Sequence, residues 1–129
     1  MKAEHWYFHA CPLAFPSTRW RCRIIDSADG DTPTLYVDLG WFRLAMLEIR
    51  LSDIDTYERR SGTTVERALG VAAWRFFLAA AGGRWAYLTT RMDDDKYGRI
   101  LGTLEYVADG GALHSISAEL RAAGFEKPR

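Results

Sequence analysis

The sequence predicts an α+β protein, mainly β, in which a five-stranded barrel carries one main helix after its third strand and a short C-terminal helix. Three observations predict this fold. Five strand-like runs flank one long helical pattern, three before it and two after it. Clusters of Gly, Asp and Ser separate several of the runs. The 129 residues, 48% hydrophobic and 26% charged, suffice for one globular domain with its own core.

The first three runs are expected to be neighbouring strands joined by turns. Residues 20–26 alternate apolar side chains with arginines, which predicts a strand with one mixed face. Residues 27–33 are rich in turn formers, and residues 34–38 alternate again. Residues 41–55 follow a turn at Gly40. Because this last run is longer than the mean strand of about five to six residues, it predicts a bend or a bulge.

Residues 63–83 form the clearest helical pattern. Thr63 and Glu66 have the spacing of a capping box, and Gly82-Gly83 stops the helix. One apolar stripe is expected to pack on the barrel: Val65, Leu69, Ala72, Phe76 and Ala80. Large aromatic side chains are expected in the core or in helix packing: Trp41, Phe42, Trp74, Phe76 and Phe77.

The C-terminal half completes the barrel. Residues 84–91 and 99–107 are expected to form a hairpin whose connection is longer than two residues. Residues 115–124 form a short helix that ends at Gly124. Three strands, a helix, two strands and a small helix give the element order of an OB-like barrel. Residues 1–18 are then an N-terminal arm, and the domain spans residues 19–129.

Charge and cysteine content restrict the possible functions. Seventeen Lys and Arg balance 17 Asp and Glu, so any site for a polyanion must be local. The chain has no run of about 18 apolar residues, which argues against a membrane span. Two cysteines are too few for a disulfide framework, and residues 1–17 make a poor secretory signal; both favour the cytoplasm. A monomer is expected, and the apolar arm either covers a barrel edge or contacts a partner protein.

Three charged motifs stand at the expected strand ends. They are Asp29-Gly30-Asp31-Thr32, then Arg50 followed by Asp55-Thr56-Tyr57-Glu58, and finally Asp95-Lys96-Tyr97-Gly98-Arg99. Each motif alone is typical of a turn or a solvated loop. In this order and at these separations, they resemble the motifs of the staphylococcal nuclease (thermonuclease) family. The likeness runs from about Trp20 to Gly124.

This resemblance implies a five-stranded OB barrel and calcium-dependent hydrolysis of DNA, RNA or both. By the resemblance, Asp31 and Asp55 match calcium ligands, and Thr56 matches a ligand through its backbone carbonyl. Glu58 matches the carboxylate that activates water, and Arg50 and Arg99 match the arginines that hold the phosphate. Lys96 and Tyr97 match nucleotide contacts. Calcium takes several oxygen ligands, and two guanidiniums suit a phosphate that gains charge during attack. A non-catalytic OB module that binds nucleic acid or a protein is the alternative.

The sequence also departs from the family pattern. Tyr57 stands where the family usually has proline, so the loop that aims Glu58 lacks a fixed φ angle. Well-known members are basic, whereas this chain is neutral, so its binding to long nucleic acid is expected to be weaker, more salt-sensitive or partner-dependent.

Arginines on the first strand allow two interpretations. Arg19, Arg21 and Arg23 interleave with Trp20. They either follow a phosphate backbone, as in grooves that bind single strands, or only solubilise an exposed strand face. Trp20 itself is expected to be a core residue, and the three histidines are expected at the surface.

Overall fold

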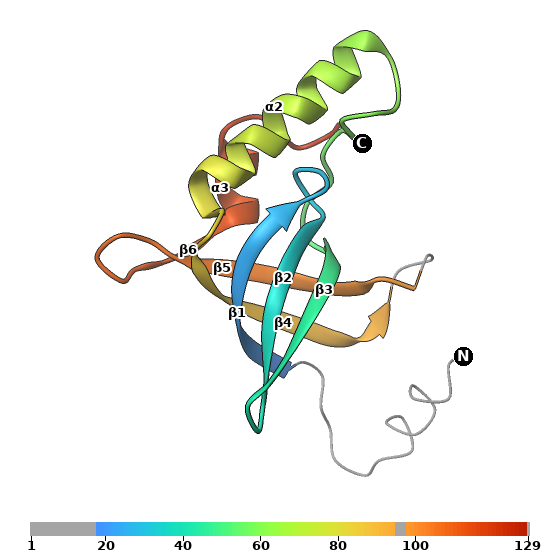
Figure 1. Ribbon diagram of the computed structural model, residues 1–129. Coiled ribbons are helices and arrows are strands. Elements are labelled where there is room, and N and C mark those ends of the chain that lie inside the picture. Colours follow the sequence, from blue (N-terminus) through green and yellow to red (C-terminus); the bar gives the residue numbers. More distant parts are fainter. Residues whose placement is uncertain (1–17, 95–97, 129) are drawn as a thin grey trace.

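Five strands close into a barrel in the computed structural model, which describes residues 18–94 and 98–128 (Figure 1). The strands are β1 (Thr18–Ser27), β2 (Pro33–Gly40), β3 (Arg43–Leu51), β4 (Trp85–Asp94) and β5 (Ile100–Val107). Neighbours in the order β3-β2-β1-β4-β5 pair antiparallel. A parallel pairing of β3 with β5 closes the barrel. The predicted α+β, OB-like fold is confirmed.

Two helices lie at one end of this barrel (Figure 1). They are α2 (Thr64–Ala81), after β3, and α3 (Ile116–Ala122), close to the C-terminus. A short strand, β6 (Leu113–Ser115), precedes α3 and pairs antiparallel with β5. The sequence did not predict β6, because three residues are too few to show an alternating pattern. Within the described ranges, no helix is long and apolar enough to cross a membrane.

The predicted ends of α2 are confirmed. The Thr63 hydroxyl accepts a hydrogen bond from the Glu66 backbone N–H at 3.1 Å, and the Glu66 carboxylate accepts one from the Thr63 N–H at 2.9 Å. The helix ends at Ala81, where Gly83 adopts a φ of 75° that an L side chain would resist.

The apolar stripe predicted for α2 is wrong in its N-terminal half. Val65 is 69% exposed and Leu69 is 41% exposed. The fully buried positions lie elsewhere on the helix: Gly70, Ala73, Phe77 and Ala81. The N-terminal half of α2 extends past the strands (Figure 1). Its apolar side chains therefore have no barrel surface beneath them.

The bend expected within residues 41–55 is also misplaced. β3 is one strand of nine residues that ends at Leu51, and the rest of the run is loop. The irregularities lie in other strands: between Asp38 and Gly40 of β2, which pairs with β3, and between Ile24 and Asp26 of β1, which pairs with β2. Residues 41–55 looked too long for one strand because the loop residues after Leu51 continue the alternation of polar and apolar side chains.

The core fills the barrel and the interface with α2. Its fully buried side chains include Ile24, Leu35, Ile49, Leu51, Phe77, Leu88 and Leu104. Trp20, Trp74 and Phe76 are partly buried. The expectation for Trp41 and Phe42 is wrong, because they are 93% and 109% exposed. They form the two-residue turn between β2 and β3, at the tip farthest from the helices (Figure 1).

Cys22 is a buried thiol of β1, and burial raises its pKa to about 12. Because the thiolate is the reactive form, this cysteine should be inert in the folded protein. We expect a Cys11→Ser variant to resist iodoacetamide at pH 8 and to react once urea unfolds it. Mass spectrometry of the intact protein measures the modified fraction. Rapid modification of the folded variant would contradict the packing described here.

Candidate functional site

Asp31 is held at the end of the barrel by three segments. It follows the turn between β1 and β2 and is 5% exposed. Its backbone carbonyl accepts a hydrogen bond from Leu51 N–H at 2.9 Å, which ties the turn to the end of β3. Its carboxylate accepts hydrogen bonds from the Thr56 N–H and the Thr32 hydroxyl, each at 3.0 Å. A buried carboxylate bonded in this way has one defined orientation.

Arg50 joins Asp31 to Asp55. Its Nη2 lies 3.3 Å from Asp31 Oδ2 and 3.1 Å from Asp55 Oδ1. Its Nη1 donates to the carbonyls of Leu51 and Ile54, the latter at 2.7 Å. The side chain of Arg50 is 19% exposed, whereas that of Asp55 is 62% exposed. One guanidinium thus bridges a buried and an exposed carboxylate. We call Asp31, Arg50, Asp55 and Thr56 the Arg50 cluster.

Thr56 lies behind the two carboxylates. Besides the N–H bonded to Asp31, it has a buried hydroxyl oxygen with no hydrogen-bond partner among the described residues. Gly30 faces it, since a Cβ at Gly30 would lie 3.0 Å from the Thr56 hydroxyl and 2.9 Å from the Cβ of Ala73. The glycine of the first motif therefore lets the β1–β2 turn pack against α2.

An open pocket of about 350 Å³ adjoins the Arg50 cluster. Arg50 and Asp55 line it together with the C-terminal segment, including Arg121 and Lys127. The Lys127 N–H donates to the Asp55 carbonyl at 2.7 Å, so this segment also holds the Asp55 loop in place. Three cationic side chains thus meet three acidic ones at one solvent-accessible hollow: Arg50, Arg121 and Lys127 with Asp53, Asp55 and Glu126.

Glu58 lies on a different side of the same loop. Its exposed carboxylate accepts a hydrogen bond from the Ser61 hydroxyl. It lines a second, smaller pocket with Asp29, Arg59 and Arg60. The structure therefore brings Asp31, Arg50, Asp55 and Thr56 together and leaves Glu58 next to them, directed to another hollow.

Arg99 lies just before β5, on the far side of the parallel pairing from Arg50. In that pairing Ile49 is opposite Ile100 and Arg50 is opposite Leu101. Because paired residues of neighbouring strands share a face, Leu101 lies on the outer face that Arg50 occupies, and Arg99 precedes this pairing by one residue. The predicted nucleotide contacts Lys96 and Tyr97 lie outside the described residues.

Arg59 and Trp74 fix the loop around the site, although Arg59 had no expected role and Trp74 was expected only in the core or in helix packing. The Arg59 N–H donates to the Asp29 carboxylate at 3.0 Å, and its Nε donates to the Ala28 carbonyl at 2.5 Å. Its guanidinium stacks on the Trp74 ring, 4.3 Å from the ring centre. Asp29 therefore does more than shape its turn. Only the position of Arg59, next to Glu58 in the sequence, could have indicated this link.

Gly70 is the second structural residue that the sequence analysis missed. A Cβ at Gly70 would lie 2.3 Å from the Glu58 carbonyl oxygen and 2.8 Å from that of Tyr57. The middle of α2 therefore packs directly on the backbone of the Tyr57–Glu58 loop. An isolated glycine inside a helical pattern was the available signal, because it often marks a close approach of another backbone.

Comparisons with known proteins add no family to this picture. Neither a protein-family model nor a curated protein matches the chain. A functional interpretation therefore rests on the barrel and on the residues gathered at its end.

Proposed function

We propose that the protein is a calcium-dependent nuclease that hydrolyses phosphodiester bonds of DNA, RNA or both. The observation that carries the proposal is the convergence of the Asp31 and Asp55 carboxylates on one nitrogen of Arg50. Two carboxylates that lie this close together would supply oxygen ligands to a cation, and the guanidinium beside them would be a donor for phosphate.

The donor set fits calcium. Among the described residues, no three or more His, Cys, Asp or Glu side chains form a metal-binding group. Calcium, however, also accepts backbone carbonyls and water as ligands. The carboxylates of Asp31 and Asp55 and the carbonyl of Thr56 would hold it, since both carboxylates lie within 3.3 Å of one Arg50 nitrogen and therefore close to each other. When bound, the ion would polarise a phosphoryl oxygen and acidify water.

Arg50 and Arg99 would bind the scissile phosphate. Two backbone carbonyls hold Nη1 of Arg50, so its guanidinium is oriented before a substrate arrives. Such preorganised donors matter most when the phosphate gains charge in the transition state. Arg99 directly precedes Ile100, which pairs with Ile49 next to Arg50 across the β3–β5 seam. Two arginines at this seam would contact different oxygens of one phosphate.

Glu58 would take a proton from the attacking water. Proline is missing from its loop, but the packing of Gly70 against the Glu58 carbonyl restrains the backbone instead. The carboxylate would have to leave the Ser61 hydroxyl and turn towards the Arg50 cluster. In ligand-free enzymes the general base is often poorly aligned, and its catalytic hydrogen bonds form only when the substrate binds.

Cleavage assays test this proposal. We expect purified protein to cleave single-stranded DNA or RNA in calcium and to stop in chelator. Glu58→Gln should reduce the single-turnover rate about 10²–10⁴-fold, the usual contribution of a general base. Asp109→Asn is a matched control. Asp109 lies in the turn before β6, its side chain is 95% exposed, and it pairs with Arg84. Cleavage that Glu58→Gln leaves unchanged would contradict the role of Glu58.

A non-catalytic module is the second candidate. The contact of Glu58 with Ser61, in a pocket separate from that of Arg50, favours it. Binding of nucleic acid without cleavage in calcium, magnesium or manganese would replace the nuclease proposal with this one. Glu58→Gln should then leave affinity unchanged.

A further inference from the structure

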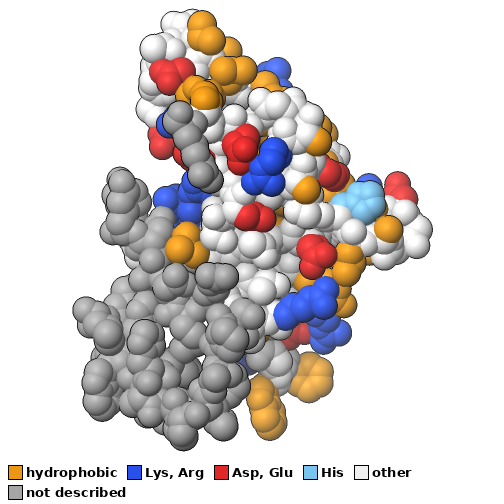
Figure 2. Space-filling view, turned by 180° about the vertical axis from the view of Figure 1, so that it is seen from behind, with side chains coloured by type: hydrophobic (Ala, Val, Ile, Leu, Met, Phe, Trp, Pro, Cys, Tyr) orange, Lys and Arg blue, Asp and Glu red, His pale blue; other side chains and the backbone are white. Residues whose placement is uncertain are grey.

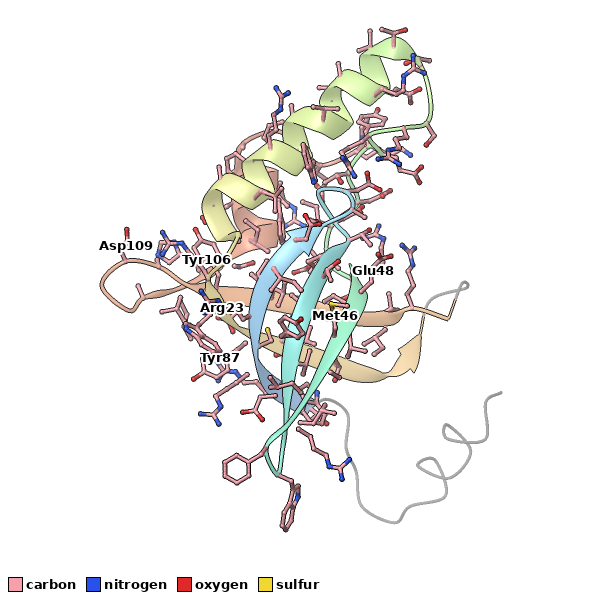
Figure 3. The ribbon with its side chains drawn as sticks, in the orientation of Figure 1. Arg23, Met46, Glu48, Tyr87, Tyr106 and Asp109 are labelled. Atoms are coloured by element: carbon pink, nitrogen blue, oxygen red, sulfur yellow. The ribbon has the colours of Figure 1, made fainter. Side chains whose placement is uncertain are left out.

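Three arginines line the outer face of β1, away from the Arg50 cluster. Arg19 lies over the Tyr87 ring at 4.1 Å, and Arg23 lies over the Trp85 ring at 5.3 Å. Arg21, between them, pairs with Asp38 of β2 at 3.0 Å. Figure 3 shows Arg23 and Tyr87 on the same side of the barrel. The arginines are therefore interleaved with aromatic rings from β4.

Two adjoining hollows cross this face. One, of about 380 Å³, is lined by Trp85, Tyr87, Arg21 and Asp38 among others. The second, of about 460 Å³, is lined by Trp41, Phe42, Leu44 and again Arg21 and Asp38. Because the hollows share Arg21 and Asp38, they form one surface from β4 to the β2–β3 turn. We call this surface the aromatic groove.

The turn at one end of the groove has an unfavourable backbone for its residues. Trp41 and Phe42 have φ angles of 56° and 57°, which are typical of a type I′ turn. Asn-Gly is the usual choice there, because bulky side chains resist positive φ. Both rings also project into water, and Figure 2 shows hydrophobic side chains beside Lys and Arg side chains at this end. Strained, exposed aromatic residues are frequent where a ligand binds.

We propose that the aromatic groove binds single-stranded nucleic acid. Bases would stack on Trp41, Phe42 and Trp85, and phosphates would meet the arginines of β1. This combination of stacking rings and a positive groove is how proteins hold single strands without sequence preference. The proposal rests on the proposed function for its ligand class.

The charges of the groove favour this ligand. Arg19, Arg21 and Arg23 face two carboxylates, Asp38 and Glu105, so the local charge is positive although the whole chain is neutral. The side chain of Arg21 is 73% exposed despite its pairing with Asp38. Because Arg21 lines both hollows, its guanidinium can contact a phosphate bound in either of them.

The turn end of the groove and the Arg50 cluster lie at opposite ends of β3. Arg43 begins the strand beside the turn, and Arg50 lies seven residues further along it. At about 3.4 Å per residue, this separation is about 24 Å. A polymer several nucleotides long could occupy both, whereas a dinucleotide could occupy only one. The groove would thus give a chain without net charge a local binding site for long nucleic acids.

The test measures binding without cleavage. Fluorescence anisotropy with a labelled oligothymidine of about 16 nucleotides, in chelator, gives the affinity. The variant W41N/F42G supplies the residues that a type I′ turn prefers, so it should fold at least as stably as the parent. We expect Trp85→Ala to raise Kd about 5–150-fold, the range for one lost base stack, and W41N/F42G, which removes two rings, to raise it by at least as much.

The salt dependence of binding tests the arginines. Replacing both Arg21 and Arg23 with glutamine should lower the slope of log K against log salt by about 1.4, or about 0.7 for each phosphate contact to a single strand. Arg75→Gln, on the exposed side of α2, is the matched control and should leave the slope unchanged.

Three results would overturn the groove proposal. These are an unchanged Kd in W41N/F42G and Trp85→Ala, an equal effect of Arg75→Gln, and a parent protein that binds anionic vesicles or self-associates through Trp41 without binding oligothymidine. Hydrolysis of a dinucleotide separates this proposal from the nuclease proposal. Groove variants should keep that activity. If no variant or parent cleaves, but the groove variants still lose affinity, the groove stands and the nuclease proposal fails.

Discussion

Arg50→Ala should reduce calcium-dependent cleavage about 10³-fold or more, as the loss of a phosphate-binding arginine does in other phosphoryl-transfer sites. The side chain lies between Asp31 and Asp55, and two backbone carbonyls fix its orientation. Arg50→Lys should not restore the rate, because lysine lacks the planar fork that holds two acceptors at once. Single-turnover cleavage at saturating enzyme measures this loss.

The same variant should also change the response of stability to calcium. The Asp31 side chain, which is 8% exposed beside Arg50, loses its positive partner in this variant, a change that typically costs about 3–5 kcal/mol in a buried pair. Calcium should offset part of this loss, so the ion should raise the Tm of Arg50→Ala more than that of the parent. Arg75→Ala is the surface control. An Arg50→Ala protein with full activity would remove the basis of the proposed function.

Gly70→Ala should destabilise the protein by about 1–3 kcal/mol, the usual range for overpacking, even though alanine favours helices. The new Cβ would lie 2.3 Å from the Glu58 carbonyl oxygen and 2.5 Å from its carbon, and backbone atoms cannot move aside as a flexible side chain can. The loop would have to shift, and cleavage should fall because Glu58 moves with it. Urea unfolding and single-turnover cleavage measure the two effects.

A matched control separates the packing effect from helix propensity. Ala79 is exposed on the same helix, so Ala79→Gly should cost about 0.5–1 kcal/mol and leave cleavage unchanged. Gly70→Ala with unchanged activity and increased stability would show that α2 does not restrain the Glu58 loop.

The sequence predicted the barrel because its signals are local and repeated. Alternating runs, turn residues and the Thr63–Glu66 cap each specify an element without knowledge of the others. The pattern does not tell where an element meets its neighbours. Val65 and Leu69 looked like a buried stripe, but they lie on the part of α2 that extends past the strands. Trp41 and Phe42 looked buried because residue type alone favours burial.

The residues of the candidate site were predictable from the sequence, but their packing on α2 was not. Asp31, Arg50 and Asp55 were expected to share one site because their motifs resemble those of the staphylococcal nuclease family, and the structure places them in contact. The partner of Glu58, the stacking of Arg59 on Trp74 and the fit of Gly70 all depend on how α2 docks on a loop. Docking of this kind follows from shape in three dimensions and leaves no periodic trace in a sequence.

The parallel pairing of β3 with β5 has a consequence for when the site comes into existence. It comprises three residue pairs, from Ile49 with Ile100 to Leu51 with Gly102, and it joins segments about fifty positions apart. Contacts of such long sequence separation form late in folding, because they must overcome the entropy of closing a large loop. Arg50 and Arg99 stand on opposite sides of this seam. A chain that has formed its hairpins but has not yet sealed the seam holds its two arginines apart, so the proposed phosphate site would be complete only once this long-range pairing has formed.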